Sequence, residues 1–300
     1  MSKALSIAIL AQDESPNIAA LCDTISNRGH EPILIFYQKC DIACDLTGSH
    51  LYVEGQKFTR QVDGVMLRSW GVQVPLGEEV QRHFESTGAV PSNPVLSVHL
   101  SNDKWASLQR LASYGVPVPP SYLITQSARL FPVIEQLGGF PLVLKALRGT
   151  WGKAVHQIDN AEQAETLFDQ YQNMGLAVLL QKFVAANDAD HRLVVVDGNM
   201  VANVMRVAPP GSFKANVSGG GHAEKYTASP QMCELAVKAS QAMGHRVSGV
   251  DIMIDHTTGQ LYVGEVNDGP DLIKTGQIAG IDTVGIVVDD FVQQIRQSRR

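Results

Sequence analysis

The fold of this chain is decided by two segments, Gly249-Val250-Asp251-Ile252-Met253-Ile254 and Leu261-Tyr262-Val263-Gly264-Glu265-Val266-Asn267. Both are rich in β-forming residues, and a Thr-Thr-Gly turn separates them, so the pattern predicts a β-hairpin. Glu265 and Asn267 are two residues apart, which places both side chains on one face of their strand. Asp251 can lie opposite them on the partner strand.

Three oxygen-bearing side chains on one face are typical of a site for Mg²⁺, which binds a few carboxylates together with substrate phosphates. The alternative is a polar hairpin face in contact with solvent, because Asp and Glu are common on open sheet faces. The three residues alone leave both interpretations open. The surrounding Val, Ile and Tyr residues favour the metal, since a carboxylate inside an apolar element needs a partner.

Strand and hairpin patterns extend upstream from these segments to about Gly138. We expect strands at 140–146 and 176–184, and a hairpin of 193–196 with 200–205 around an Asp-Gly turn. An amphipathic helix is expected over 230–243. Nearer the N-terminus, a strand at 7–10, a helix at 17–28 and strands at 32–36 and 64–68 predict a βαβ domain, with a hairpin at 51–58.

A domain boundary is indicated by the turn residues Pro91, Asn93 and Pro94. After it, Asn102 is expected to cap a helix that ends at Gly115. The sequence thus predicts an α/β fold with two domains, 1–95 and 96–300.

Composition narrows the function classes. The chain has 300 residues, of which 44% are hydrophobic and 18% charged, with a net charge of −6. An acidic chain without basic clusters is a poor nucleic-acid binder. No apolar run reaches membrane-spanning length, and the N-terminus lacks a signal-peptide pattern, so we expect a cytoplasmic protein. The four cysteines lack zinc spacing and are expected to be reduced thiols.

Several further residues carry possible chemistry. Glycines in Gly149-Thr150-Trp151-Gly152 could let backbone N–H groups approach a phosphate, although a plain turn fits equally well. Lys145 lies inside an apolar strand, where it either extends to solvent or meets a phosphate. The loop at 219–222 either closes over a substrate or is simply flexible. Its His222 is a candidate substrate contact, but a lone loop histidine is more often only solvated, so we assign it no general-base role.

Together, the ordered motifs resemble the ATP-grasp ligases, and most closely the RimK-like branch of ribosomal-protein glutamate ligases and LysX-type amino-acid ligases. The motifs that carry this resemblance are Asp103-Lys104-Trp105-Ala106-Ser107-Leu108-Gln109, Gly115-Val116-Pro117-Val118-Pro119, Pro141-Leu142-Val143-Leu144-Lys145, Gly149-Thr150-Trp151-Gly152, Gly249-Val250-Asp251 and Glu265-Val266-Asn267. The resemblance covers nearly the whole chain. It implies an α/β (α+β) ATP-grasp fold with an N-terminal Rossmann-like pre-ATP-grasp domain. The ATP-grasp part would divide into a central subdomain at about 115–185 and a C-terminal one at about 186–300.

The resemblance also implies site residues. Asp251, Glu265 and Asn267 match the Mg²⁺ ligands, with Mn²⁺ as a substitute. Arg68 and Arg206 match arginines that face substrate. The residues that match ATP contacts are Lys104, Lys145, Gly149, Thr150, Trp151, Gly152, Gln181, Lys182, Phe183, Val184, Asp190, Lys214 and Asn216, of which Gln181 to Val184 would hold adenine and Asp190 would lie near the ribose.

The sequence departs from the family pattern at the expected substrate end. Val207 replaces the second arginine of a pair, Gly219 replaces an arginine before two glycines, and Asp268-Gly269-Pro270 replaces Ser-Pro-Gly. Lys182 also stands where many members have Glu. The first three changes weaken the expectation that the substrate is glutamate.

The function implied is a ligase in which a carboxylate attacks the γ-phosphate of ATP and an amine then attacks the acyl phosphate. Lys145 and Arg206 would be catalytic. The acceptor would be an amino acid, a peptide, or a carrier or ribosomal protein, and the enzyme a homodimer or homotetramer. The alternative is an ATP-binding regulatory protein without turnover. A nicotinamide oxidoreductase is disfavoured because residues 10–15 lack the required glycine turn.

Overall fold

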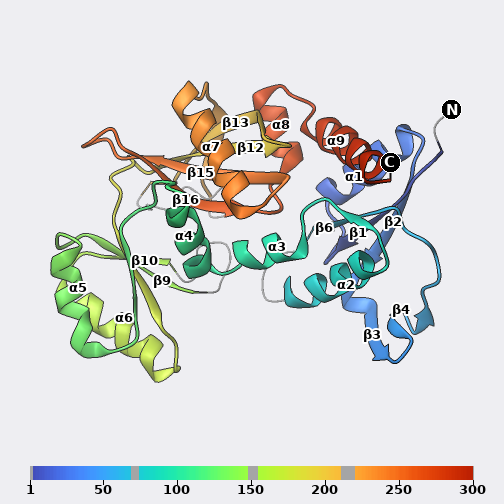
Figure 1. The fold of residues 1–300 in the computed structure, drawn as a ribbon. Helices are drawn as coiled ribbons and strands as arrows, with labels where there is room; N and C mark the ends of the chain where they lie inside the picture. The colour runs from blue at the N-terminus through green and yellow to red at the C-terminus, as the bar shows by residue number, and fades with distance from the viewer. Residues whose placement is uncertain (1–2, 69–73, 148–154, 211–219, 300) are drawn as a thin grey trace.

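The structure is a computed structural model that describes residues 3–68, 74–147, 155–210 and 220–299. Its N-terminal part is a parallel sheet with helices packed on it (Figure 1). Its strand order is β2-β1-β6-β7. The elements are β1 (Ser6–Ala11), α1 (Pro16–Asn27), β2 (Glu31–Phe36), β6 (Gly64–Arg68), α2 (Val74–Ser86) and β7 (Val90–Pro91). The expected βαβ unit is confirmed. Because β1 and β6 are parallel, Arg68 lies beside Ala11 at the carboxyl edge of the sheet.

A small antiparallel sheet is attached to this domain. It contains β3 (Cys40–Asp45), β4 (Gly48–Val53) and β5 (Gln56–Lys57), and η1 (Tyr37–Lys39) precedes it. The hairpin predicted at 51–58 is therefore confirmed as β4 and β5. Strand β3 was not predicted, and its residues are mostly exposed.

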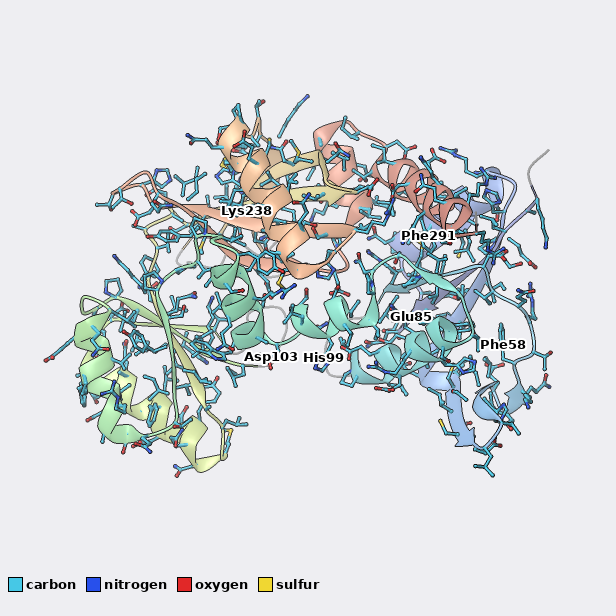
Figure 2. The ribbon with its side chains drawn as sticks, in the orientation of Figure 1. Phe58, Glu85, His99, Asp103, Lys238 and Phe291 are labelled. Atoms are coloured by element: carbon cyan, nitrogen blue, oxygen red, sulfur yellow. The ribbon has the colours of Figure 1, made fainter. Side chains whose placement is uncertain are left out.

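Two short helices connect the N-terminal sheet to the rest, α3 (Val95–Ser101) and α4 (Lys104–Ser113). The prediction that Asn102 caps the second helix is wrong. Asp103 caps it, because its carboxylate accepts hydrogen bonds from the backbone N–H groups of Trp105 and Ala106. Asn102 instead ends α3. Figure 2 labels Asp103 at this junction.

The central part is a four-stranded antiparallel sheet of order β10-β9-β11-β8, with two helices packed on it (Figure 1). Phe168 on the second helix is fully buried in its core. The strands expected at 140–146 and 176–184 are present but shorter. The elements are β8 (Ser121–Ile124), η3 (Ser127–Arg129), α5 (Leu130–Gln136), β9 (Leu142–Ala146), β10 (Val155–Ile158), α6 (Ala161–Asn173) and β11 (Val178–Lys182).

The C-terminal part is an antiparallel sheet of order β14-β13-β12-β15-β16. Asp197 and Gly198 both have positive φ, 46° and 74°, which confirms the predicted hairpin turn. The predicted helix at 230–243 is confirmed as α7. The elements are β12 (Ala189–Val196), β13 (Asn199–Val207), β14 (His222–Lys225), α7 (Pro230–Met243), β15 (Val247–Ile254), β16 (Leu261–Asn267), α8 (Leu272–Ala279) and α9 (Thr283–Ser298).

The N- and C-terminal sheets share one hydrophobic core. Ile9 from β1, Val194 from β12 and Phe291 from α9 belong to the same buried cluster. Phe291 is labelled in Figure 2, where α9 runs alongside the N-terminal sheet. This shared core holds the carboxyl edge of the N-terminal sheet close to the C-terminal sheet.

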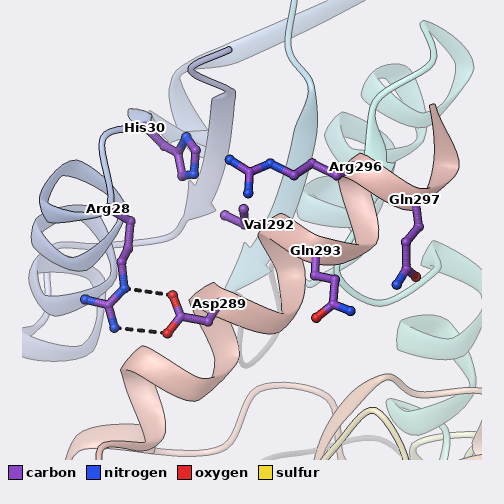
Figure 3. A pocket seen from close by; sticks show the side chains of 7 residues that line it. All are labelled: Arg28, His30, Asp289, Val292, Gln293, Arg296 and Gln297. Carbon is purple, nitrogen blue, oxygen red and sulfur yellow. Dashed lines mark hydrogen bonds and ion pairs between the residues drawn. The ribbon is translucent and has the colours of Figure 1, made fainter. Parts of the chain in front are cut away.

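A pocket of about 490 Å³ lies between α1 and α9 (Figure 3). Arg28 and Asp289, which both line it, form two hydrogen bonds with each other, 2.7 and 3.0 Å long. None of the site residues predicted from the sequence lines it.

Asn93 connects the N-terminal part of the fold to the C-terminal sheet through a buried side chain. Its Nδ2 donates to the Val247 carbonyl (2.7 Å) and its Oδ1 accepts from the backbone N–H groups of Arg246 (2.8 Å) and Val247 (2.9 Å). Asn93→Ala leaves these groups unsatisfied, so we expect a loss of about 2–4 kcal/mol in the free energy of unfolding. Urea denaturation would measure it. Asn199→Ala, at the exposed first residue of β13, is the control, and an equally small loss for Asn93→Ala would contradict the role.

Candidate active site

The three predicted metal ligands lie together on one hairpin. Asp251 of β15 pairs directly with Glu265 of β16, and Gly249 pairs with Asn267. Asn267 Nδ2 is 3.4 Å from Asp251 Oδ2 and donates a 3.2 Å hydrogen bond to the Gly249 carbonyl. The predicted placement of Asp251 across the hairpin from Glu265 and Asn267 is therefore confirmed.

Asp251 is held by two guanidinium groups. Arg192 of β12 pairs with it across the sheet, through Nε to Oδ1 and through Nη2 to Oδ2 at 2.9 Å. Arg206 Nη2 lies 2.9 Å from Asp251 Oδ2. The same Arg206 forms a double hydrogen bond with Asp190, at 2.6 and 2.7 Å. Two carboxylates and two guanidinium groups therefore form one network across three strands.

The charges of this network depend on one another. Burial alone would raise the pKa of Asp251, but Arg192 and Arg206 outweigh burial and lower that pKa. Burial raises the pKa of Asp190, and Arg206 offsets the shift only in part. Asp251 is therefore the carboxylate that stays ionised most firmly, as a metal ligand must.

The donor set fits Mg²⁺, with one condition. Asp251, Glu265 and Asn267 offer two carboxylates and an amide oxygen, which are oxygen ligands of the kind this ion prefers. In the described residues no three His, Cys, Asp or Glu side chains gather as a metal site. The predicted set would therefore need the amide of Asn267 as its third donor. Both Asp251 oxygens contact arginines, so a metal there would have to displace a guanidinium from one of them.

Two lysines from other elements lie near the predicted metal ligands. Lys104, the first residue of α4, places Nζ 3.9 Å from Glu265 Oε1. Lys145 on β9 donates a 2.7 Å hydrogen bond to Gln181 Oε1, and Gln181 Nε2 donates to Ser121 Oγ at 2.7 Å. Burial lowers the pKa of Lys145 to about 8, although the nearby Glu265 opposes the shift. The two lysines and the predicted metal ligands therefore lie near one another, between the central and C-terminal sheets.

The segment predicted to hold adenine is the end of β11 and the residues after it. The Lys182 N–H donates to the Pro120 carbonyl at 2.9 Å, and its side chain is exposed. Gln181 is buried and positions Lys145, while Val184 is buried and Phe183 half-buried. Asp190, expected near the ribose, is already bonded to Arg206, and a ribose contact stays a prediction.

The predicted substrate residues come from two domains. Arg68 ends β6 and donates a 2.7 Å hydrogen bond to the Pro270 carbonyl. Arg206 is buried between Asp190 and Asp251. His222 is exposed on β14 and pairs with Val207, one position from Arg206. The remaining predicted residues lie outside the described part of the chain, namely Gly149, Thr150, Trp151, Gly152, Lys214 and Asn216.

The roles of two residues in this site were not predicted from the sequence. Arg192 was given no role, and Asp268 was noted only as a departure from the family pattern. The spacing of Asp190 and Arg192, two apart on a strand, could have indicated that both side chains face Asp251. Burial raises the pKa of Asp268 to about 6, with Arg68 opposing it. Only the tertiary packing of Asp268 against the N-terminal domain reveals its environment.

Solved structures of similar fold are ATP-grasp ligases. The ligase PsnB, complexed with precursor peptide PsnA2 and AMPPNP, aligns with a TM-score of 0.72 at 19% identity, covering 98% of this chain and 99% of that one. D-alanine–D-alanine ligase from Bacillus anthracis, complexed with ATP, aligns at 0.70 and 20% identity over 99% of both chains. The expected ATP-grasp fold is confirmed.

Family models identify the chain more closely. Residues 101–290 match the RimK-like ATP-grasp domain, and residues 5–98 match the RimK PreATP-grasp domain. A probable alpha-L-glutamate ligase from Serratia proteamaculans is 30% identical over 99% of this chain and 98% of its own. Another from Shewanella halifaxensis is 32% identical over 89% of this chain, which spans only 58% of that protein. The chain belongs to the RimK-like ATP-grasp family.

The low pKa of Lys145 predicts proton uptake when a triphosphate binds. Burial holds this pKa at about 8, and phosphate charge would raise it. Above pH 8, binding must therefore add a proton, and affinity should fall as pH rises toward the pKa of the complex. Calorimetry with a non-hydrolysable ATP analogue at pH 8.5, in buffers of different ionisation enthalpy, measures the uptake. Equal binding enthalpies in all buffers would contradict it, and Lys145→Met should abolish any difference.

Proposed function

We propose that the protein is an ATP- and Mg²⁺-dependent carboxylate–amine ligase that forms an amide or peptide bond through an acyl phosphate. The observation that supports it best is that Lys104 and Lys145 both lie near Glu265, one of the three proposed metal ligands. Family membership and the probable glutamate ligases among its relatives support the same conclusion. Its cofactor is Mg²⁺, and Mn²⁺ can replace it.

Each group of site residues has its own proposed role. Asp251, Glu265 and Asn267 would hold Mg²⁺, which supplies charge neutralisation on the phosphates. Lys104 and Lys145 bind the phosphates of ATP as the substrate carboxylate oxygen attacks the γ-phosphoryl group. Gln181 orients Lys145 through its 2.7 Å hydrogen bond. The segment from Gln181 to Val184 binds adenine through backbone groups.

Arg206 is proposed to stabilise the tetrahedral intermediate, formed when the amine attacks the acyl phosphate, before phosphate leaves. The position of Arg206 supports this role, because its Nη2 contacts both Asp190 and the proposed metal ligand Asp251. Arg206→Ala with a near-wild-type kcat would contradict this role.

The partners follow from this chemistry. The substrates are a small carboxylate and an amine, with an amino acid, a peptide, or a carrier or ribosomal protein as acceptor. We propose a homodimer or homotetramer located in the cytoplasm. None of the helices in the described residues combines the length and hydrophobicity needed to span a membrane.

A phosphate-release screen tests the proposal. Pairs of amino acids are added to protein, ATP and Mg²⁺. The released phosphate is measured, and the masses of the products are determined by mass spectrometry. Release that depends on both substrates, with a product lighter than their sum by one water, supports the ligase. Tight ATP binding with no stimulated release, by small amines or by candidate acceptor proteins, would instead indicate an ATP-binding regulator.

A further inference from the structure

Ser121, the first residue of β8, has a hydroxyl group with two close partners. Its Oγ lies 2.7 Å from the Pro119 carbonyl oxygen and 2.7 Å from Gln181 Nε2. A carbonyl oxygen can only accept a hydrogen bond, so the single hydroxyl proton must point at Pro119. Towards Gln181 the hydroxyl therefore offers only lone pairs, and it accepts rather than donates.

The strand register places this serine on the same face of the central sheet as Lys145. Gln181 of β11 pairs directly with Ser121, and Lys145 of β9 pairs with Leu179, two residues before Gln181. Because side chains alternate along a strand, all three polar side chains lie on one face. The neighbouring Leu180 points the other way, into the buried core under the two helices. Ser121 and Gln181 thus lie on the face that carries the proposed phosphate-binding lysine.

The Ser121 hydroxyl decides which way the Gln181 amide faces. The oxygen and NH2 ends of an amide have nearly the same shape, so hydrogen-bond partners set its orientation. With Ser121 as acceptor, the NH2 group faces Ser121 and the carbonyl oxygen faces Lys145, whose Nζ donates to it at 2.7 Å. An ammonium group can only donate, so the reverse orientation would place two donors together. Gln181 is 3% exposed, so bulk water contributes little to fixing its amide.

The Pro119 carbonyl that anchors the hydroxyl is itself held in place. On one side, the Pro117 carbonyl accepts a 2.8 Å hydrogen bond from the Val263 N–H of β16. On the other, the Pro120 carbonyl accepts a 2.9 Å hydrogen bond from the Lys182 N–H of β11. The proline rings also fix φ at these positions. The hydroxyl of Ser121 is therefore positioned by a backbone segment that is attached to both the C-terminal and the central sheet.

We propose that Ser121 is a positioning residue for Lys145, because its hydroxyl holds the Gln181 amide with the carbonyl oxygen towards the lysine. This inference rests on the proposed ligase function and adds a residue that acts only through Gln181. Without the hydroxyl, the amide is free to turn its NH2 group towards the ammonium. Two donors then face each other, and the lysine loses the acceptor that holds it in place for a phosphate.

Two variants of equal shape test the role of the hydroxyl. Ser121→Thr keeps the hydroxyl, whereas Ser121→Val has the shape of threonine without it, and both residue types suit a strand. Ser113→Ala is the control, because Ser113 is exposed at the end of α4 and its hydroxyl bonds only the nearby Arg110 carbonyl. Each change is also made in a Lys145→Met background.

Affinity for a non-hydrolysable ATP analogue with Mg²⁺ is measured from the rise in unfolding midpoint with analogue concentration, which also reports weak binding. The midpoint without analogue checks the fold of each variant. We expect Ser121→Val to weaken binding about tenfold, which corresponds to the loss of one well-placed charged contact. Ser121→Thr should stay within about threefold of the wild type. Ser113→Ala should bind as the wild type does.

The Lys145→Met background separates positioning from a general packing defect. If Ser121 acts through Gln181 on the lysine, Ser121→Val should weaken binding less than about twofold there, because no lysine is left to position. A packing defect would weaken binding equally in both backgrounds. That result, or equal binding by Ser121→Val and Ser121→Thr, would overturn the inference.

Failure of the proposed function gives a different result. A wild type that binds the analogue but releases no phosphate with any carboxylate–amine pair or protein acceptor rejects the ligase and leaves the positioning of Lys145 standing. Stimulated phosphate release that is unchanged in Ser121→Val, together with unchanged analogue binding, keeps the ligase and rejects the role of Ser121. A wild type that binds no analogue would overturn both.

Discussion

Replacing Glu265 by glutamine is expected to lower the rate of ATP-dependent phosphate release by about 10³-fold, equivalent to about 4 kcal/mol of transition-state stabilisation. Glutamine keeps the shape but removes the charge that would hold the metal. The side chain is 45% exposed, and among the described residues it forms one ion pair, the 3.9 Å contact with Lys104. Stability should therefore change little, because a partly exposed long contact contributes little to folding.

Phosphate release, measured at an Mg²⁺ concentration that just saturates the wild type, checks the rate, and thermal unfolding of the same preparation checks the fold. Glu224→Gln is the matched control, because Glu224 is an exposed carboxylate on β14 of the same sheet. A Glu265→Gln enzyme within tenfold of the wild type would remove Glu265 from the metal site. High Mg²⁺ should restore part of the lost rate if the defect is one of metal affinity.

Most of the fold could be predicted from the sequence wherever hydrophobic periodicity and turn residues indicate the same element. The hairpin of Asp251 and Glu265, the Asp197-Gly198 turn and helix α7 all carry strong local signals, and all are confirmed. The capping residue of α4 was missed, because Asn102 and Asp103 are both good caps and only the end of α3 decides between them. Local patterns cannot show where a preceding helix stops.

The site could be predicted only in part, because several of its contacts join strands and segments that are distant in the sequence. Spacing of two along β16 placed Glu265 and Asn267 on one face, and this needed no tertiary information. The pairing of Arg192 with Asp251 depends on the register between β12 and β15, and contacts across strands are not encoded locally. The environment of Asp268 depends on Arg68, two hundred residues away in the sequence. Family resemblance gave roles to single residues but not the network that connects them.

Replacing Arg206 by methionine is expected to destabilise the protein by about 3–5 kcal/mol, because removing one partner from a buried ion network leaves a charge uncompensated. Asp190 would lose both of its hydrogen bonds and Asp251 one of its two guanidinium contacts. Urea denaturation in EDTA measures the loss. Arg28→Met is the matched control, since Arg28 forms the same double hydrogen bond with Asp289 on the surface, and we expect its unfolding to be nearly unchanged.

Mg²⁺ should reverse part of this loss. In the wild type a metal at Asp251 must displace a guanidinium, whereas in Arg206→Met one of those groups is already gone. A ligand that binds only the folded state stabilises it according to its affinity, so the rise in unfolding midpoint between EDTA and Mg²⁺ should be larger for Arg206→Met than for the wild type. The same comparison with Arg28→Met should match the wild type. An equal rise in all three proteins would show that the metal does not compete with Arg206 for Asp251, and the ligand set would have to be revised.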